Sequence, residues 1–200
     1  MLDRWLRRWK DRMLAPIARR LGQHVGPGMV TVTALLVGLC AALALSRAAT
    51  VLALGLWLAN RLLDGLDGAV ARATGRSTDF GGYLDIVCDF VVYAAIPLAI
   101  AVARPELALS VGVLLGTFYV NTASWMYLAA ILERRGRGAS TTGEVTQVTM
   151  PPGLIGGTET VVLFALAIAV PEATETTFWV MSVLVAITTL QRLAWAARKL

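Results

Sequence analysis

The stretch from Leu62 to Phe90 carries an unusual set of acids, namely Asp64, Asp67, Asp79, Asp85 and Asp89. The segments on either side of it are strongly apolar, VLALGLWLAN before it and VVYAAIPLAI after it. An ionised acid in the hydrocarbon part of a bilayer costs at least ~2.5 kcal/mol. Because carboxylates are the hard oxygen ligands that Mg²⁺, Mn²⁺ and Ca²⁺ prefer, acids placed here indicate a site for divalent cations.

The spacing of these acids tells which of them can act together. Asp64 and Asp67 are three residues apart, and Asp85 and Asp89 are four apart, so each pair shares one face of a helix. The short turn at 74–79 makes the two helices neighbours. We therefore expect four carboxylates to converge on one patch, where bound cations would offset their mutual repulsion.

The composition places these helices in a membrane. Of the 200 residues, 57% are hydrophobic and only 16% are charged, whereas a soluble domain has about a quarter charged residues. The mean hydropathy is +0.68. We attribute the net charge of +5 to membrane topology and expect no nucleic-acid partner. Cys40 and Cys88 lack CxxC spacing, so neither a disulfide framework nor a zinc site is predicted.

The predicted fold is an all-α integral membrane protein with six transmembrane helices preceded by an amphipathic interfacial helix. Gly and Pro residues separate the apolar runs, and the spans are predicted at 29–46, 51–73, 80–103, 107–132, 154–170 and 176–197. The first run lacks a small-x-small cleavage site, so it is expected to remain as a span. The domains are then the helix 1–22 and a transmembrane domain 23–200.

The N-terminal segment 1–22 has seven basic residues interleaved with apolar ones, including Trp5 and Trp9. The apolar residues recur at helical spacing and face away from the cations, which is typical of a helix lying on anionic headgroups. A solvated basic tail is the alternative, and it gives the two tryptophans no role.

Basic residues also set the orientation. They are frequent in segment 1–22, at the end of the second span, in the 133–153 loop and at the C-terminus, whereas the opposite side has only Arg47 and Arg104. By the positive-inside rule, both termini and the acidic cluster face the cytoplasm.

Small residues accompany the acids. Gly65, Gly68 and Ala71 leave one side of the second span without bulk, and Gly81 does the same at the start of the third. Such residues also serve close helix packing, but beside the acids they favour space for a ligand. Arg72 adds a cation that can contact phosphate.

Together these residues form the pattern D-x2-D-G-x2-A-R-x8-G-x3-D-x3-D, matched by Asp64, Asp67, Gly68, Ala71, Arg72, Gly81, Asp85 and Asp89. The pattern resembles the signature of the CDP-alcohol phosphatidyltransferases, a family of integral membrane enzymes. The chain is most similar to the short bacterial inner-membrane members, so the resemblance implies a multi-pass protein of the bacterial cytoplasmic membrane and a homodimer.

The resemblance also implies roles. Asp64, Asp67 and Asp85 would bind two Mg²⁺ or Mn²⁺ ions, with Asp89 joining them and acting as general base. An acceptor hydroxyl would attack the β-phosphorus of CDP-diacylglycerol and release CMP. The residues implied in nucleotide or phosphate binding are Thr31, Gly68, Ala71, Arg72 and Gly81. Thr31 ends a segment that in many relatives reads P-N-x-x-T, and here Gly28 replaces the asparagine.

The acceptor side departs from the inositol-phosphate branch, since Phe90 and the segment 156–160 replace basic residues of that branch. Arg192 is similar to an acceptor-site arginine there, and Arg134 and Glu159 are further candidates. We expect a small polyol or polyol-phosphate acceptor. Asp79 lies outside the pattern and is predicted to cap the third span, whereas Arg61 can either neutralise the acids or extend towards the interface.

Three alternatives remain on the sequence alone. The same acids would serve a transferase that joins a soluble CDP-alcohol to a lipid acceptor. Intramembrane aspartates also mark divalent-cation transporters, although a transporter leaves Gly68, Ala71 and Arg72 unexplained. A catalytically silent membrane scaffold is the third.

Overall fold

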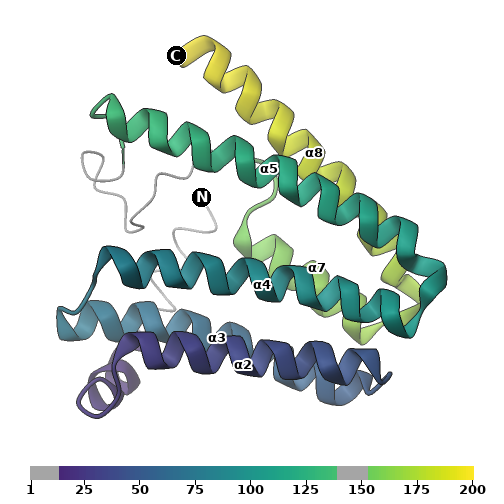
Figure 1. The fold of residues 1–200 in the computed structure, drawn as a ribbon, viewed down its shortest axis with the longest axis horizontal. Coiled ribbons are helices and arrows are strands. Elements are labelled where there is room, and N and C mark those ends of the chain that lie inside the picture. Colours follow the sequence, from purple (N-terminus) through teal and green to yellow (C-terminus); the bar gives the residue numbers. More distant parts are fainter. Residues whose placement is uncertain (1–13, 139–152) are drawn as a thin grey trace. The chain divides into compact units, whose positions relative to one another are not determined.

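The computed structural model describes residues 14–138 and 153–200, and in these ranges every regular element is helical (Figure 1). The long helices of these described ranges are α2 (Pro27–Ser46), α3 (Thr50–Thr74), α4 (Asp79–Ala103), α5 (Ala108–Arg134), α7 (Gly157–Ala169) and α8 (Thr174–Lys199). Two short 3₁₀ helices, η1 (Pro105–Leu107) and η2 (Pro171–Ala173), precede α5 and α8. The all-α class is confirmed, and each predicted span coincides with a helix to within a few residues at either end.

The chain divides into two compact units, residues 1–107 and 108–200. In the first unit, α2 packs against both α3 and α4, and the three helices run alongside one another (Figure 1). Trp57, Val92 and Ile96 are almost completely buried between them. The acids of α3 and α4 therefore stand on helices that a shared apolar core holds in place.

The turn between α3 and α4 is short because both helix ends are capped locally. Gly75 ends α3 in the left-handed conformation, with φ of 64°, which glycine adopts without a steric penalty. Thr78 is the N-cap of α4, and its hydroxyl accepts a hydrogen bond from the Gly81 N–H at 3.0 Å. The predicted cap at Asp79 is thus wrong by one residue. Asp79 is the first residue of α4, where the positive end of the helix dipole stabilises its negative charge.

In the second unit, α8 packs against both α5 and α7. Its core is aromatic: the rings of Phe164 and Phe178 meet edge to face with centroids 6.3 Å apart, and Phe118 lies 6.2 Å from Phe164. Such pairs add stability beyond the area they bury. This core fixes α8, which carries Arg192.

Four of the described segments are long and apolar enough to cross a membrane, namely Pro27–Ser46, Asp79–Ala103, Pro105–Arg134 and Pro171–Lys199. α3 has 25 residues but is too polar to count among these apolar segments, because it carries Arg61, Asp64, Asp67 and Arg72. α7 has 13 residues, about 20 Å of helix. Large apolar side chains such as Val51, Leu62 and Leu190 are well exposed, as on a lipid-facing surface. The chain is a membrane protein, and the count of six spans stays a prediction.

The segment before α2 is described only from residue 14. Residues 14–21 are helical, and Leu14, Ala18 and Leu21 pack against an apolar cluster of α3 that includes Ala69 and Val70. Residues 1–13, which carry both tryptophans of the predicted interfacial helix, lie outside the described residues, so that helix remains a prediction.

Candidate active site

One pocket in the first unit brings the motif acids together. Its wall is built from α2, α3 and α4 and is formed by Thr31, Ala34, Leu35, Asn60, Arg61, Asp64, Asp67, Asp85, Cys88, Asp89 and Val92. Asp64 and Asp67 come from one face of α3, and Asp85 and Asp89 from one face of α4. The four carboxylates that the spacing led us to expect on one patch therefore line the same pocket.

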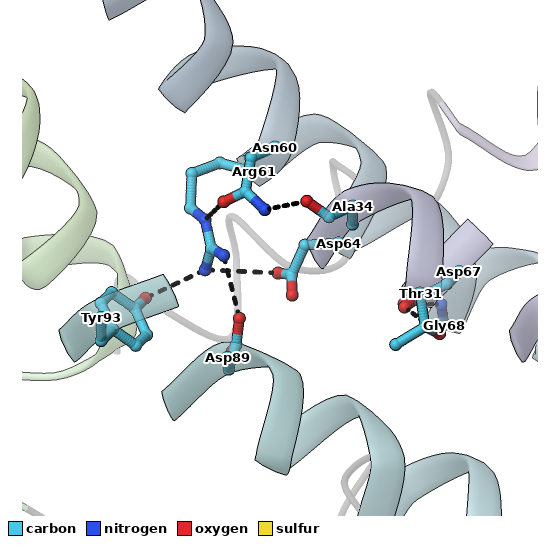
Figure 2. A network of polar contacts seen from close by, with 9 residues as sticks. All are labelled: Thr31, Ala34, Asn60, Arg61, Asp64, Asp67, Gly68, Asp89 and Tyr93. Atoms are coloured by element: carbon cyan, nitrogen blue, oxygen red, sulfur yellow. Dashed lines mark hydrogen bonds and ion pairs between the residues drawn. The ribbon is translucent and has the colours of Figure 1, made fainter. Parts of the chain in front are cut away.

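Arg61 joins the acids of the two helices. Its Nη2 donates to Asp89 Oδ1 at 2.9 Å, and its Nη1 lies 3.8 Å from Asp64 Oδ2 (Figure 2). Nη1 also donates to the Tyr93 hydroxyl at 3.2 Å, and Nε donates to Asn60 Oδ1 at 2.7 Å. Of the two roles left open for Arg61, the geometry supports neutralisation of the acids.

Asp67 has a separate set of partners, away from Arg61 (Figure 2). It is only 5% exposed, and its Oδ2 accepts a hydrogen bond from the Thr31 hydroxyl at 2.7 Å. The backbone N–H of Gly68 donates to its other oxygen. A buried carboxylate needs such donors, so Thr31 of α2 fixes the orientation of Asp67.

The arrangement can be tested for its fit to divalent ions. Among the described residues, no three acidic, histidine or cysteine side chains are close enough to hold one ion together; Arg61 lies against Asp64 and Asp89, and Asp67 is bonded to Thr31. The donor set itself, four carboxylates on one pocket, has the hard oxygen chemistry of Mg²⁺ and Mn²⁺. The residues present therefore fit such ions in their chemistry.

The other motif residues on α3 and α4 are not part of the pocket wall. The Arg72 side chain is exposed and extends over Gly68: a Cβ on Gly68 would come within 3.2 Å of Arg72 Nη1. Ala71 is half-buried in the same helix. Gly81 belongs to the first turn of α4, where its N–H serves the Thr78 cap.

The candidate acceptor residues belong to the second unit and have different partners there. Arg192 is only 6% exposed; its Nη1 donates to Asn121 Oδ1 at 2.8 Å, and its Nε has no hydrogen-bond partner in the described part of the chain. Arg134 is exposed at the end of α5. Glu159 is exposed and accepts from the Gly156 N–H at 3.0 Å, which makes it a cap of α7.

Three residues around Arg61 were missed at the level of sequence, namely Trp57, Asn60 and Tyr93. Trp57 lies four residues before Arg61, Asn60 four before Asp64, and Tyr93 four after Asp89. A polar group one helical turn from a motif acid, inside an apolar span, was the available signal.

Comparison with known proteins identifies the family of this chain. The family model described as CDP-alcohol phosphatidyltransferase matches residues 24–191, which include all eight motif positions. The chain belongs to this family. It is therefore a membrane-bound transferase of phospholipid biosynthesis, and a cation transporter or a silent scaffold is no longer needed to explain its acids.

Relatives of this phosphatidyltransferase come from bacteria and archaea. The inner membrane protein YnjF of Escherichia coli is 35% identical over 183 residues, covering 86% of this chain and 83% of the relative. An archaetidylinositol phosphate synthase of Pyrococcus horikoshii is 36% identical over 77 residues, 38% of this chain and 41% of that protein.

Solved structures match over more of the phosphatidyltransferase chain. The phosphatidylinositol phosphate synthase PgsA1 of Mycobacterium tuberculosis with CDP-DAG bound has a TM-score of 0.73 and 26% identity, covering 92% of each chain. The same protein in complex with manganese and citrate has a TM-score of 0.72 and 26% identity, with 90% of this chain and 87% of that chain covered.

Proposed function

We propose that this enzyme moves a phosphatidyl group from CDP-diacylglycerol to a hydroxyl of a small polyol or polyol phosphate and releases CMP. The observation that carries the proposal is the single pocket lined by all four motif carboxylates. The similarity to PgsA1, solved with CDP-DAG bound, over 92% of the chain supports the choice of donor.

Asp64, Asp67 and Asp85, joined by Asp89, would hold two divalent ions, Mg²⁺ or Mn²⁺. When bound, these ions neutralise charge on the pyrophosphate and on the departing phosphate. The solved complex of PgsA1 with manganese supports the use of divalent ions. Asp67 is already oriented for such a role, since Thr31 and the Gly68 N–H hold its carboxylate.

Asp89 is the proposed general base. In the reaction, the acceptor oxygen forms a bond to the β-phosphorus, the bond from that phosphorus to the oxygen of CMP breaks, and the hydroxyl proton passes to Asp89. Its side chain is 32% exposed, whereas that of its partner Arg61 is only 9% exposed. A proton acceptor must be reachable from the pocket, and Asp89 meets that condition.

Thr31, Gly68, Ala71, Arg72 and Gly81 are the proposed nucleotide and phosphate contacts. The side chain of the exposed residue Arg72 lies above Gly68 and supports this assignment, since Gly68 has no side chain in the space beside the guanidinium. On the acceptor side we propose Arg192, Arg134 and Glu159. The buried guanidinium of Arg192 supports a phosphorylated acceptor, because it offers an Nε donor that the described residues leave without a partner.

We further propose six spans in a bacterial cytoplasmic membrane, with both termini and the pocket facing the cytoplasm, and a homodimer as the working form. The similarity to an inner membrane protein supports the location, and the basic residues at one side of the apolar helices support the orientation.

The deciding experiment measures CMP released by purified protein in detergent with CDP-diacylglycerol and Mg²⁺. The acceptors are glycerol 3-phosphate, inositol, inositol phosphate, serine and phosphatidylglycerol. Acceptor-dependent CMP should fall at least about 100-fold in Asp89→Asn, the size of effect typical for loss of a general base. Asp79→Asn removes an equal charge from the exposed first turn of α4 and should keep most of the activity.

If no acceptor gives CMP, a soluble CDP-alcohol with a diacylglycerol acceptor is tested next. CMP in that arm alone would replace the proposed direction with the reverse one. CMP release that survives in Asp89→Asn would instead remove Asp89 from its proposed role.

A further inference from the structure

Arg61 is a cation built into the acidic pocket. Its guanidinium lies 2.9 Å from an oxygen of Asp89 and 3.8 Å from one of Asp64. The side chains of the two acids are 32% and 26% exposed, while that of Arg61 is 9% exposed. Arg61 therefore approaches the carboxylates from the interior of the helix bundle, and the acids face the pocket.

Several groups keep the guanidinium in this place. Trp57 and Tyr93 supply aromatic rings with centroids 4.9 and 5.0 Å from the Arg61 Cζ, a distance at which rings attract cations. Asn60 accepts from Nε at 2.7 Å and itself donates to the Ala34 carbonyl of α2 at 2.7 Å. Figure 2 shows Arg61 between Asn60 and Tyr93, with the Asn60 amide joined to the Ala34 carbonyl. Three helices thus contribute to fixing one positive charge.

A fixed guanidinium has a consequence for metal binding. A carboxylate oxygen that accepts a short hydrogen bond from Arg61 cannot donate the same lone pair to a divalent ion. Hydrogen bonds to charged groups are among the stronger polar interactions in proteins. Divalent binding at Asp89 must therefore displace a hydrogen bond from Arg61. At Asp64, whose oxygen lies 3.8 Å from the guanidinium, it must overcome the repulsion between the ion and Arg61.

We propose that Arg61 is a positioning residue that holds Asp64 and Asp89 in the metal-free enzyme and competes with divalent ions for them. This inference rests on the proposed metal site. Arg61 keeps the acids paired and oriented when no ion is bound, and it sets the divalent concentration at which the site fills. Removing its charge should therefore strengthen divalent binding while it weakens the packing of the empty pocket.

The test measures Mn²⁺ binding directly, without substrate. Purified protein in detergent is titrated with Mn²⁺, and free Mn²⁺ is followed by its electron paramagnetic resonance signal. Arg61→Gln should bind Mn²⁺ at least about tenfold more tightly than the unmodified protein, the change expected when a charged hydrogen bond no longer opposes binding. Tyr93→Phe removes only the hydroxyl that accepts from Arg61 and should tighten binding by a smaller factor in the same direction.

The matched control is Arg104→Gln. Arg104 is paired with Glu106 at 3.1 Å beyond the end of α4, so the change removes an equal charge about 20 Å along the helix from Asp89. Its Mn²⁺ affinity should stay that of the unmodified protein. An equal gain in Arg104→Gln and Arg61→Gln would show that net charge alone is responsible and would overturn the proposal.

Unchanged or weaker Mn²⁺ binding in Arg61→Gln would also overturn it, because competition predicts a gain. If size exclusion and circular dichroism show that Arg61→Gln does not fold, the Mn²⁺ affinity of Tyr93→Phe decides. Tighter binding then supports the proposal, and unchanged or weaker binding overturns it. Loss of Mn²⁺ binding in Asp64→Asn tests the metal site itself. If Asp64→Asn still binds Mn²⁺, the proposed function is contradicted. If Asp64→Asn loses Mn²⁺ binding but Arg61→Gln leaves the affinity unchanged, only this inference is contradicted.

Discussion

Asp67 and Asp89 solve the problem of a carboxylate among apolar helices in two different ways. Asp67 is 5% exposed and accepts neutral donors, the Thr31 hydroxyl and the Gly68 N–H. Asp89 is 32% exposed and is paired with a cation, Arg61. Neutral donors orient a carboxylate without placing a positive charge beside it, so Asp67 is held with no cation against it, whereas Asp89 lies against the guanidinium of Arg61.

Thr31→Val tests the importance of that neutral donor. Valine keeps the shape of threonine but cannot donate to Asp67 Oδ2, which now accepts at 2.7 Å. A hydrogen bond to a charged group is worth about 1.5–3 kcal/mol, so kcat/KM for CDP-diacylglycerol should fall about ten- to 100-fold. CMP release at varied donor concentration measures the change.

Thr33→Val is the matched control for this substitution. Thr33 is exposed on the same helix, and its hydroxyl donates to the Met29 carbonyl one turn earlier at 2.8 Å. Its kcat/KM should stay within about twofold of the unmodified enzyme, since surface changes of this kind are worth less than about 0.5 kcal/mol. Equal losses in both variants would point to α2 packing rather than to Asp67.

Arg192→Gln tests the acceptor side. The Arg192 Nη1 is held by Asn121 Oδ1 at 2.8 Å, while its Nε has no hydrogen-bond partner in the described ranges. If Arg192 binds an acceptor phosphate, the loss of a charge-assisted bond raises KM for that acceptor at least about tenfold. KM for CDP-diacylglycerol should change little.

The control for Arg192 is Arg198→Gln in the last turn of α8. Arg198 is exposed, and its Nε donates to the Ala194 carbonyl of its own helix, so its loss should leave both KM values unchanged. An increase in KM for the donor, and none for the acceptor, in Arg192→Gln would assign Arg192 to the other substrate.

At the scale of elements, α2 is the helix that sets the pocket geometry, although it contributes no acid. It packs against both α3 and α4, and at Gly38 it lies close against α4, since Gly38 has no side chain to keep Val92 away. Thr31 and the Ala34 carbonyl, both on α2, bind Asp67 and Asn60. A shift of α2 would therefore move the partners of Asp67 and Asn60 on the pocket wall.

Gly38→Ala should disturb this packing. The added Cβ would lie 2.6 Å from Val92 Cγ2 and 3.0 Å from Asn60 Nδ2. Because valine has little rotameric freedom, the helices must separate, which costs about 1–3 kcal/mol. Gly55→Ala on α3 is matched, since nothing lies within 4 Å of its new Cβ. Both variants gain the same helix propensity, so their difference in thermal unfolding temperature in detergent isolates the packing effect. Equal temperatures would contradict it.

Elements were largely predictable from sequence, and their contacts were not. Apolar runs separated by Gly and Pro located all six long helices, and the i, i+3 and i, i+4 spacing of the acids predicted which faces meet in one pocket. The sequence did not decide whether Arg61 neutralises the acids or extends towards the interface. Helical periodicity predicts the face on which a residue lies, but not the side chain that packs against it. Its partner Asn60 is the preceding residue of the same helix, but Tyr93 is 32 residues away on α4, and only packing brings Tyr93 to Arg61. Glu159 was expected near an acceptor, yet its contact with the Gly156 N–H is the local one of a helix cap.

At the scale of the whole molecule, the direction of insertion decides which aqueous phase supplies the acceptor. The turn between α3 and α4 and the segment Pro105–Leu107 lie at opposite ends of α4, which is 25 residues long, about 37 Å of helix and enough to cross a hydrocarbon core of about 30 Å. Labels placed at these two ends therefore report from opposite sides of the membrane.

Cysteine labelling tests the proposed orientation. In a variant lacking Cys40 and Cys88, a single cysteine is introduced as Ser77→Cys in the α3–α4 turn or as Glu106→Cys in η1, both at exposed positions. Because Arg72 and Arg76 flank the first site and the positive-inside rule places it in the cytoplasm, a membrane-impermeant maleimide should label only Glu106→Cys in intact spheroplasts. In inverted vesicles it should label only Ser77→Cys. The opposite pattern would place the acids near the outer face, so the acceptor would have to come from outside the cell, and a cytoplasmic polyol phosphate would no longer be a possible substrate.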